Sequence, residues 1–177
     1  MIMIEDWRPP IVEMVMVKRD LAAVDLAGVF PNHLPAVAAT EDRIRAAERA
    51  LAISLDGEHR TFLGFADGWR CFHQHVTLLG TGELVAGPLR DAASEAFLHA
   101  PEALDDLGLS SERVLPVAAS LEQADVFVMP IEGGIVGPPV HWLAEGEVVD
   151  TFESFGEYFV SMIDYTRRRV AKLREAG

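Results

Sequence analysis

Four short segments rich in β-branched and aromatic residues follow one another closely in the second half of the chain. Each is four to six residues long, and Gly, Pro or acidic residues separate it from the next: 114–118, 126–131, 140–143 and 148–152. Segments of this length and spacing are typical of strands joined by tight connections. The pattern predicts an antiparallel meander, with Glu145-Gly146 as the hairpin turn between the last two strands.

A long amphipathic helix is predicted to follow the meander. Ser154 and Glu157 have the spacing of a capping box. The apolar stripe behind it continues at helical steps through Phe155, Phe159, Met162, Ile163, Thr166, Val170 and Leu173. Acidic residues lie at the start of this helix and five Lys or Arg residues near its end, so its charges match the helix dipole.

The first half of the chain predicts further helices. Pro9-Pro10 suits the first turn of one, and Thr40 caps a second that runs to about residue 52. Asp56 caps a short third helix, expected to stop at Asp67-Gly68. The fold class is therefore α+β: an antiparallel-rich central sheet flanked by N-terminal helices and a long C-terminal helix.

Between the two halves, one strand is predicted to begin at Trp69. Its core face would carry Phe72, Val76 and Leu78, and its solvent face Cys71, His73 and His75. The sequence Gly80-Thr81-Gly82-Glu83 is typical of a turn. A polar helix over 91–99, ended by Pro101, is expected next.

Composition favours one compact domain in a reducing compartment. With 177 residues, half of them hydrophobic, the chain buries a full core; we divide it into a helical extension, 1–39, and a main domain, 40–177. The lone cysteine forms no internal disulfide, Glu5 and Asp6 stand where a secretion signal carries cations, and no apolar run is long enough for a bilayer. We expect a cytoplasmic protein.

The charge of the chain is concentrated in one stretch. Between Asp91 and Asp164 there are fifteen carboxylates and a single cation, Arg113, whereas the first ninety residues carry twelve acidic and nine basic residues. A surface of one sign repels nucleic acid and anionic lipid and attracts a basic partner. We therefore expect a basic protein partner, and neither nucleic acid nor membrane.

Six carboxylates are the candidate contacts for that partner, because each is predicted to lie in a loop or turn of the acidic stretch: Glu102, Asp105, Asp106, Glu132, Glu145 and Glu147. Trp142 is a possible aromatic anchor, although a core position is the simpler prediction for it. Glu153 and Glu157 are assigned to helix capping and are not counted.

Signals for catalysis are weak. Cys71, His73 and His75 include zinc-ligand types, but on one strand the outer two would lie roughly 13 Å apart. No serine lies in a nucleophile elbow, the glycine-rich segments lack the rest of a dinucleotide or phosphate loop, and Asp105-Asp106 is best explained as a solvated loop. We predict no metal, no cofactor and no catalytic residues.

Two blocks of sequence resemble the SUKH superfamily in its Smi/Knr-like branch. The first is Glu48-Arg49-Ala50-Leu51, then Leu55 to Leu63 and Asp67-Gly68. The second is Asp125 to Met129, then Val140 to Leu143, Glu145 to Val149, and Ser154-Phe155 through Phe159. The chain departs from the family pattern at Asp56, His59 and Asp67, where the family usually has Pro, an aromatic residue and Asn.

The resemblance implies an α+β fold and a binding role without catalytic residues. Bacterial members are typically immunity proteins that neutralise a cognate toxin, often a nuclease. The first hypothesis is therefore an immunity protein whose acidic face binds a cationic toxin surface. The alternative is a regulatory interaction module of the same fold, and a small hydrolase or metal-dependent enzyme is a third class, supported only by Cys71, His73 and His75.

Overall fold

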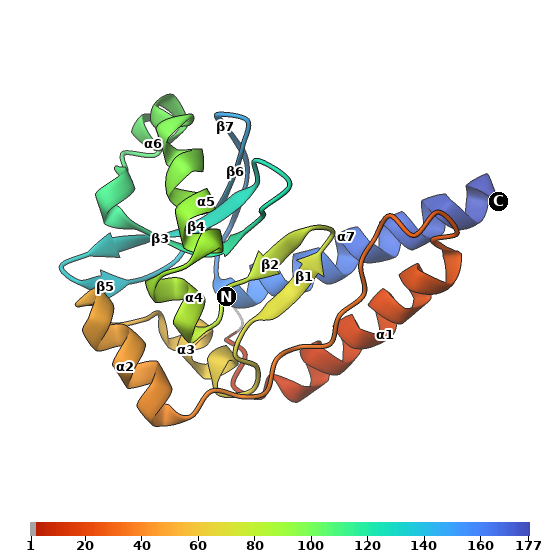
Figure 1. The fold of residues 1–177 in the computed structure, drawn as a ribbon, viewed down its shortest axis with the longest axis horizontal. Coiled ribbons are helices and arrows are strands. Elements are labelled where there is room, and N and C mark those ends of the chain that lie inside the picture. Colours follow the sequence, from red (N-terminus) through yellow and green to blue (C-terminus); the bar gives the residue numbers. More distant parts are fainter. Residues whose placement is uncertain (1–2) are drawn as a thin grey trace.

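The computed structural model describes residues 3–177 and shows one sheet with helices on both faces (Figure 1). The helices are α1 (Arg8–Val24), α2 (Glu41–Leu51), α3 (Gly57–Leu63), α4 (Thr81–Val85), α5 (Pro88–Leu98), α6 (Pro101–Asp106) and α7 (Phe155–Ala176), with a 3₁₀ turn at Ser111–Arg113. The strands are β1 (Trp69–His73), β2 (Val76–Leu78), β3 (Val114–Ala119), β4 (Val126–Glu132), β5 (Ile135–Val136), β6 (Val140–Ala144) and β7 (Glu147–Phe152). The predicted α+β class is confirmed.

The sheet is antiparallel, with the order β1-β2-β3-β4-β6-β7 and the short β5 paired to the end of β4. The predicted meander is confirmed: Leu115 pairs with Met129, and Phe127 with Trp142. The predicted hairpin turn is also present, because Glu145 and Gly146 both have positive φ, 50° and 84°, and join β6 to β7.

Each face of the sheet is covered by different helices. On one face α7 packs against the strands, and α1 packs along α7. The core between them is aromatic: the ring centroid of Trp7 lies 5.1 Å from that of Phe159 and 5.2 Å from that of Phe62. On the other face α5 and α6 insert Phe97 and Leu104 among side chains of β3, β4 and β6. The N-terminal segment therefore contributes to the main core, through Trp7 and helix α1.

The C-terminal helix has the predicted cap and stripe. Ser154 Oγ accepts a hydrogen bond from the Glu157 amide at 3.1 Å, and the Glu157 carboxylate accepts one from the Glu153 amide. Phe155, Phe159 and Met162 are fully buried. The far ends of α7 and α1 extend side by side beyond the sheet (Figure 1).

The single strand predicted from Trp69 is wrong, because the segment forms the β1–β2 hairpin around Gln74-His75. Helix α1 contacts the first strand of this hairpin. The Lys18 side chain is buried, and its Nζ donates to the Cys71 carbonyl at 2.6 Å and to the Phe72 carbonyl at 3.4 Å. Cys71 has a positive φ of 47°, and Gln74 one of 53°. The register of β1 with β2 shifts between Trp69 and His73, around Cys71.

Three other local predictions differ from the structure. Helix α3 ends at Leu63, before the predicted Asp67-Gly68 stop. The predicted turn at 80–83 begins helix α4, because the Glu83 carboxylate accepts from the Gly80 amide at 2.9 Å and caps it. Pro101 follows α5 as expected but also begins α6, since a proline costs no hydrogen bond in the first turn.

Among residues 3–177, no helix combines the length and apolarity needed to cross a bilayer.

Candidate functional site

Five of the six candidate carboxylates lie at one end of the molecule, which we call the acidic end: Glu102, Asp105, Asp106, Glu145 and Glu147. The first three are on α6 and Glu147 is the first residue of β7, which corrects their predicted loop positions, whereas Glu145 lies in the β6–β7 turn as predicted. Helix α6 packs against β7, and a Cβ on Gly146 would meet the His99 carbonyl, at the end of α5, at 3.0 Å. The fold thus joins two separate parts of the sequence into one surface.

Helix α6 holds its carboxylates outward because its other face is anchored. Ala103 and Leu104 are buried against the sheet, whereas Glu102, Asp105 and Asp106 are exposed. Asp105 and Asp106 are neighbours on a helix, so their side chains diverge and do not form a paired-carboxylate site.

Glu132 is not part of the acidic end. It is the last residue of β4, where β5 and Ser54 are its neighbours, whereas Val126 at the start of β4 pairs with Leu143 near the β6–β7 turn. Six residues of extended strand separate the two ends of β4 by about 20 Å. Glu132 was predicted in a loop but ends β4, and it lies outside the surface that the other five candidate contacts form.

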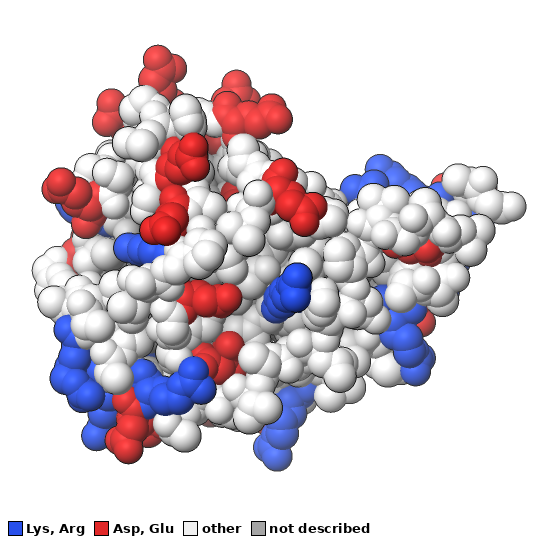
Figure 2. Space-filling model, in the orientation of Figure 1, with Lys and Arg blue, Asp and Glu red and all other residues white. Residues whose placement is uncertain are grey.

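No ion pair among the described residues neutralises the acidic end. None of its five carboxylates takes part in an ion pair there, whereas Glu41, Glu48 and Asp67 each have an arginine partner. Figure 2 shows the same division on the surface: acidic side chains gather over α5, α6 and the tip of the β6–β7 hairpin, and basic ones over α2 and the far end of α7.

Trp142 belongs to the core side of the sheet and is not part of the acidic end. Its ring stacks on Phe127 at 5.1 Å, and its Nε1 donates to Asp125 Oδ1 at 2.7 Å. The side chain is half-buried, and its ring packs in a T-shaped arrangement with Tyr165 of α7, with the ring centroids 5.9 Å apart. Its hydrogen bond and packing partners are therefore intramolecular.

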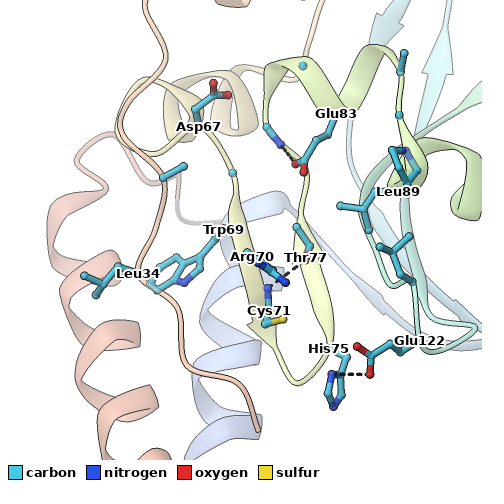
Figure 3. Close-up of a pocket in the computed structure, with 18 of the residues that line it drawn as sticks. Leu34, Asp67, Trp69, Arg70, Cys71, His75, Thr77, Glu83, Leu89 and Glu122 are labelled. Atoms are coloured by element: carbon cyan, nitrogen blue, oxygen red, sulfur yellow. Dashed lines mark hydrogen bonds and ion pairs between the residues drawn. The ribbon is translucent and has the colours of Figure 1, made fainter.

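A second site, which the sequence did not indicate, is a pocket of about 590 Å³. Figure 3 shows it between the β1–β2 hairpin and the α4–α5 segment, on the side of the hairpin away from α7. The apolar part of its lining includes Leu34, Leu89 and Leu121. Its size lies within the range of ligand-binding pockets, roughly 300–1,000 Å³.

One wall of the pocket depends on a close backbone crossing. A Cβ on Gly68 would lie 2.6 Å from the Gly80 amide nitrogen, so these two glycines allow the chain after α3 to contact the start of α4. Asp67 fixes the same crossing: it accepts from the Thr81 amide at 2.6 Å and from the Thr81 hydroxyl at 3.0 Å, and it pairs with Arg43 at 2.8 Å.

Most of the charges that line the pocket are already partnered. Asp67 pairs with Arg43, and His75 Nδ1 lies 3.1 Å from Glu122 Oε2. Glu83 accepts from the Gly80 amide through Oε2 only. Arg70 has no ion-pair or hydrogen-bond partner among the described residues, and Figure 3 shows its side chain on the pocket side of β1.

The side chains of Cys71, His73 and His75, which were considered as zinc ligands, do not point toward a common site. His73 is buried against Trp142 and Tyr165, which corrects its predicted solvent-facing position, while His75 lies in the pocket lining. Burial, assisted by Lys18 and Arg169, lowers the pKa of His73 to about 4. Among residues 3–177, no three His, Cys, Asp or Glu side chains come together in a metal-binding arrangement.

Comparisons with known proteins leave the family assignment as a prediction. No protein-family model matches the chain, and no curated protein matches it either. The fold is α+β, as the SUKH resemblance implies, but that class alone is shared by many unrelated proteins.

Proposed function

We propose that the chain is an immunity protein of the SUKH type that binds a cognate toxin through its acidic end. The observation that carries this proposal is the set of exposed carboxylates on α6 and the β6–β7 hairpin that form no ion pair within residues 3–177. Carboxylates gathered on one surface repel one another, and binding of a cationic partner reduces this repulsion. The sequence resemblance to SUKH immunity proteins supports the same role.

A cationic enzyme cleft fits this surface by charge. Nucleases hold the phosphates of their substrate with Lys and Arg, and carboxylates placed against those side chains block the same positions. Electrostatic attraction of this kind mainly raises the association rate and is weakened by salt. The proposal therefore predicts a fast, salt-sensitive complex that inhibits the toxin.

The test is a pair of charge-reversal variants with the same net charge. E102K/E145K changes the acidic end, whereas E5K/E175K changes two exposed carboxylates elsewhere. Each protein is used to capture partners from the native cells, and the captured protein is identified by mass spectrometry. The affinity of each variant for the purified partner is then measured at about 50 and about 500 mM salt.

We expect E102K/E145K to weaken binding by about tenfold or more per reversal and to abolish protection of cells that express the partner, while E5K/E175K retains both. Equal affinity of the two variants, or an affinity that does not change with salt, would refute the acidic-end interface. A captured partner that is harmless to cells would instead support a regulatory interaction module.

A further inference from the structure

The pocket of Figure 3 contains one positively charged and one negatively charged group that could each bind a ligand. Among residues 3–177, Arg70 has no partner for its guanidinium, and Glu83 uses only Oε2, which leaves Oε1 free to accept. The other lining charges are engaged in the pairs Arg43–Asp67 and His75–Glu122. A ligand would therefore place an anionic group on Arg70 and an N–H donor toward Glu83.

The apolar lining indicates the rest of the ligand. Leu34 and Leu121 are 73% and 64% exposed, and Leu89 is half-buried; Figure 3 shows Leu34 and Leu89 on opposite sides of the β1–β2 hairpin. Covering such side chains stabilises a complex by about 25 cal/mol for each Å² of apolar surface removed from water. The ligand thus carries an apolar side chain as well as its polar ends.

The charges also restrict the anion. Glu83 lies in the same lining and Glu122 is already paired with His75, so a dianion such as phosphate would meet the Glu83 carboxylate as well as the one guanidinium that has no partner among the described residues. A single carboxylate matches Arg70 in charge and pairs with a guanidinium through two parallel hydrogen bonds.

We propose that this pocket binds a monocarboxylate that carries an apolar side chain and an adjacent N–H group. Two sources share this chemistry: a free apolar amino acid, and the last residue of a peptide with an apolar C-terminus. The site is distinct from the acidic end, because no residue of that surface lines the pocket. The proposal therefore does not rest on the proposed toxin binding.

The experiment is a titration of the full ¹⁵N-labelled chain followed by amide NMR. The probes are L-leucine, N-acetyl-glycyl-leucine, the C-terminal amide of that peptide, and inorganic phosphate. The reporters are the amides of the pocket glycines Gly68, Gly80, Gly82 and Gly87. R70Q removes the proposed carboxylate contact, and R49Q removes an exposed arginine of α2 outside the pocket as the matched control.

We expect leucine, the peptide acid or both to shift the pocket glycines, and R70Q to weaken that binding about tenfold or more while R49Q does not. Binding of leucine alone assigns a free amino acid, and binding of the peptide acid alone assigns a protein C-terminus. Equal binding of the peptide amide, preference for phosphate, no effect of R70Q, or no shift up to about 20 mM of either carboxylate overturns the proposal.

Discussion

At the scale of single residues, one buried carboxylate joins three distant parts of the chain. Glu58, in the first turn of α3, is only 4% exposed. It accepts from the Gly156 amide at the start of α7 and from the Ile4 amide, both at 2.8 Å. Amides in the first turn of a helix have no partner within the helix, and a carboxylate there also meets the positive end of the helix dipole.

We expect E58A to lower the free energy of unfolding by about 3 kcal/mol, because it leaves two amides of the folded chain without their acceptor. E58Q retains an acceptor oxygen and should cost about half as much. Urea unfolding measures both, and D105A, which removes an exposed carboxylate of α6, is the control. A loss for E58A no larger than that for D105A would contradict this role.

Residue-level features were predictable where the interaction is local. Thr40, Asp56 and Ser154 cap their helices as the sequence indicated, since a capping side chain binds amides two or three residues away. Glu58 was not predictable in this way, because its partner Gly156 is 98 residues distant.

At the scale of elements, the β6–β7 hairpin has a residue poorly suited to its turn. Glu145 has a φ of 50°, in the left-handed region that Asn and Gly adopt more readily, and it forms no ion pair among the described residues. Its side chain is exposed at the acidic end. The turn geometry therefore does not explain this residue, and the proposed partner binding is the role it is tested for below.

We predict that E145N raises the free energy of unfolding by about 0.5–1 kcal/mol, because Asn-Gly is the preferred pair for a two-residue hairpin turn. The same substitution removes one carboxylate of the acidic end and should weaken binding of the captured partner. Thermal unfolding and the affinity measurement test the two effects separately. E147Q, which changes charge outside the turn, should weaken binding without the gain in stability; a destabilised E145N would refute the argument.

Elements with a continuous pattern were predicted well, and those that depend on distant contacts were not. The four strands of the meander and helix α7 follow their apolar periodicity. The β1–β2 hairpin interrupts an alternating pattern at Gln74-His75, a pair without a turn preference, and the contact of Lys18 with the Cys71 carbonyl comes from another helix. That contact leaves no signal within residues 69–78.

At the scale of the whole molecule, the concentration of acidic residues could be predicted from the sequence, whereas the pocket could not. The acidic residues of α6 and β7 lie within one stretch of sequence, and the fold keeps those elements adjacent. The pocket instead combines segments around Leu34, Arg70, Glu83 and Leu121, which no single stretch brings together. Its one sequence signal was the glycine pair at 80 and 82, which is equally typical of a turn.

Three histidines, His59, His73 and His141, are buried, and burial lowers the pKa of each, which couples the stability of the fold to pH; the shift is large for His59 and His73. His59 is completely buried against Phe155, its ring nitrogens have no hydrogen-bond partner in the described part of the chain, and burial lowers its pKa to about 3. The pKa of His73 is lowered to about 4. Both values lie below the ordinary histidine pKa of about 6.5, so the unfolded chain takes up protons that the folded chain excludes.

Stability should therefore fall as pH decreases below about 6.5, by about 2 kcal/mol for each of His59 and His73 between pH 7.5 and pH 5. H59F keeps a ring of similar size but has no ring nitrogens to desolvate or protonate. We expect it to raise the free energy of unfolding at about pH 7.5 by about 1 kcal/mol and to reduce the loss at about pH 5 by about half. Urea unfolding at both pH values is the measurement, with H99Q, which removes an exposed histidine, as the control. If H59F lost as much stability on acidification as the unmodified chain, His59 would not be the source of the pH dependence.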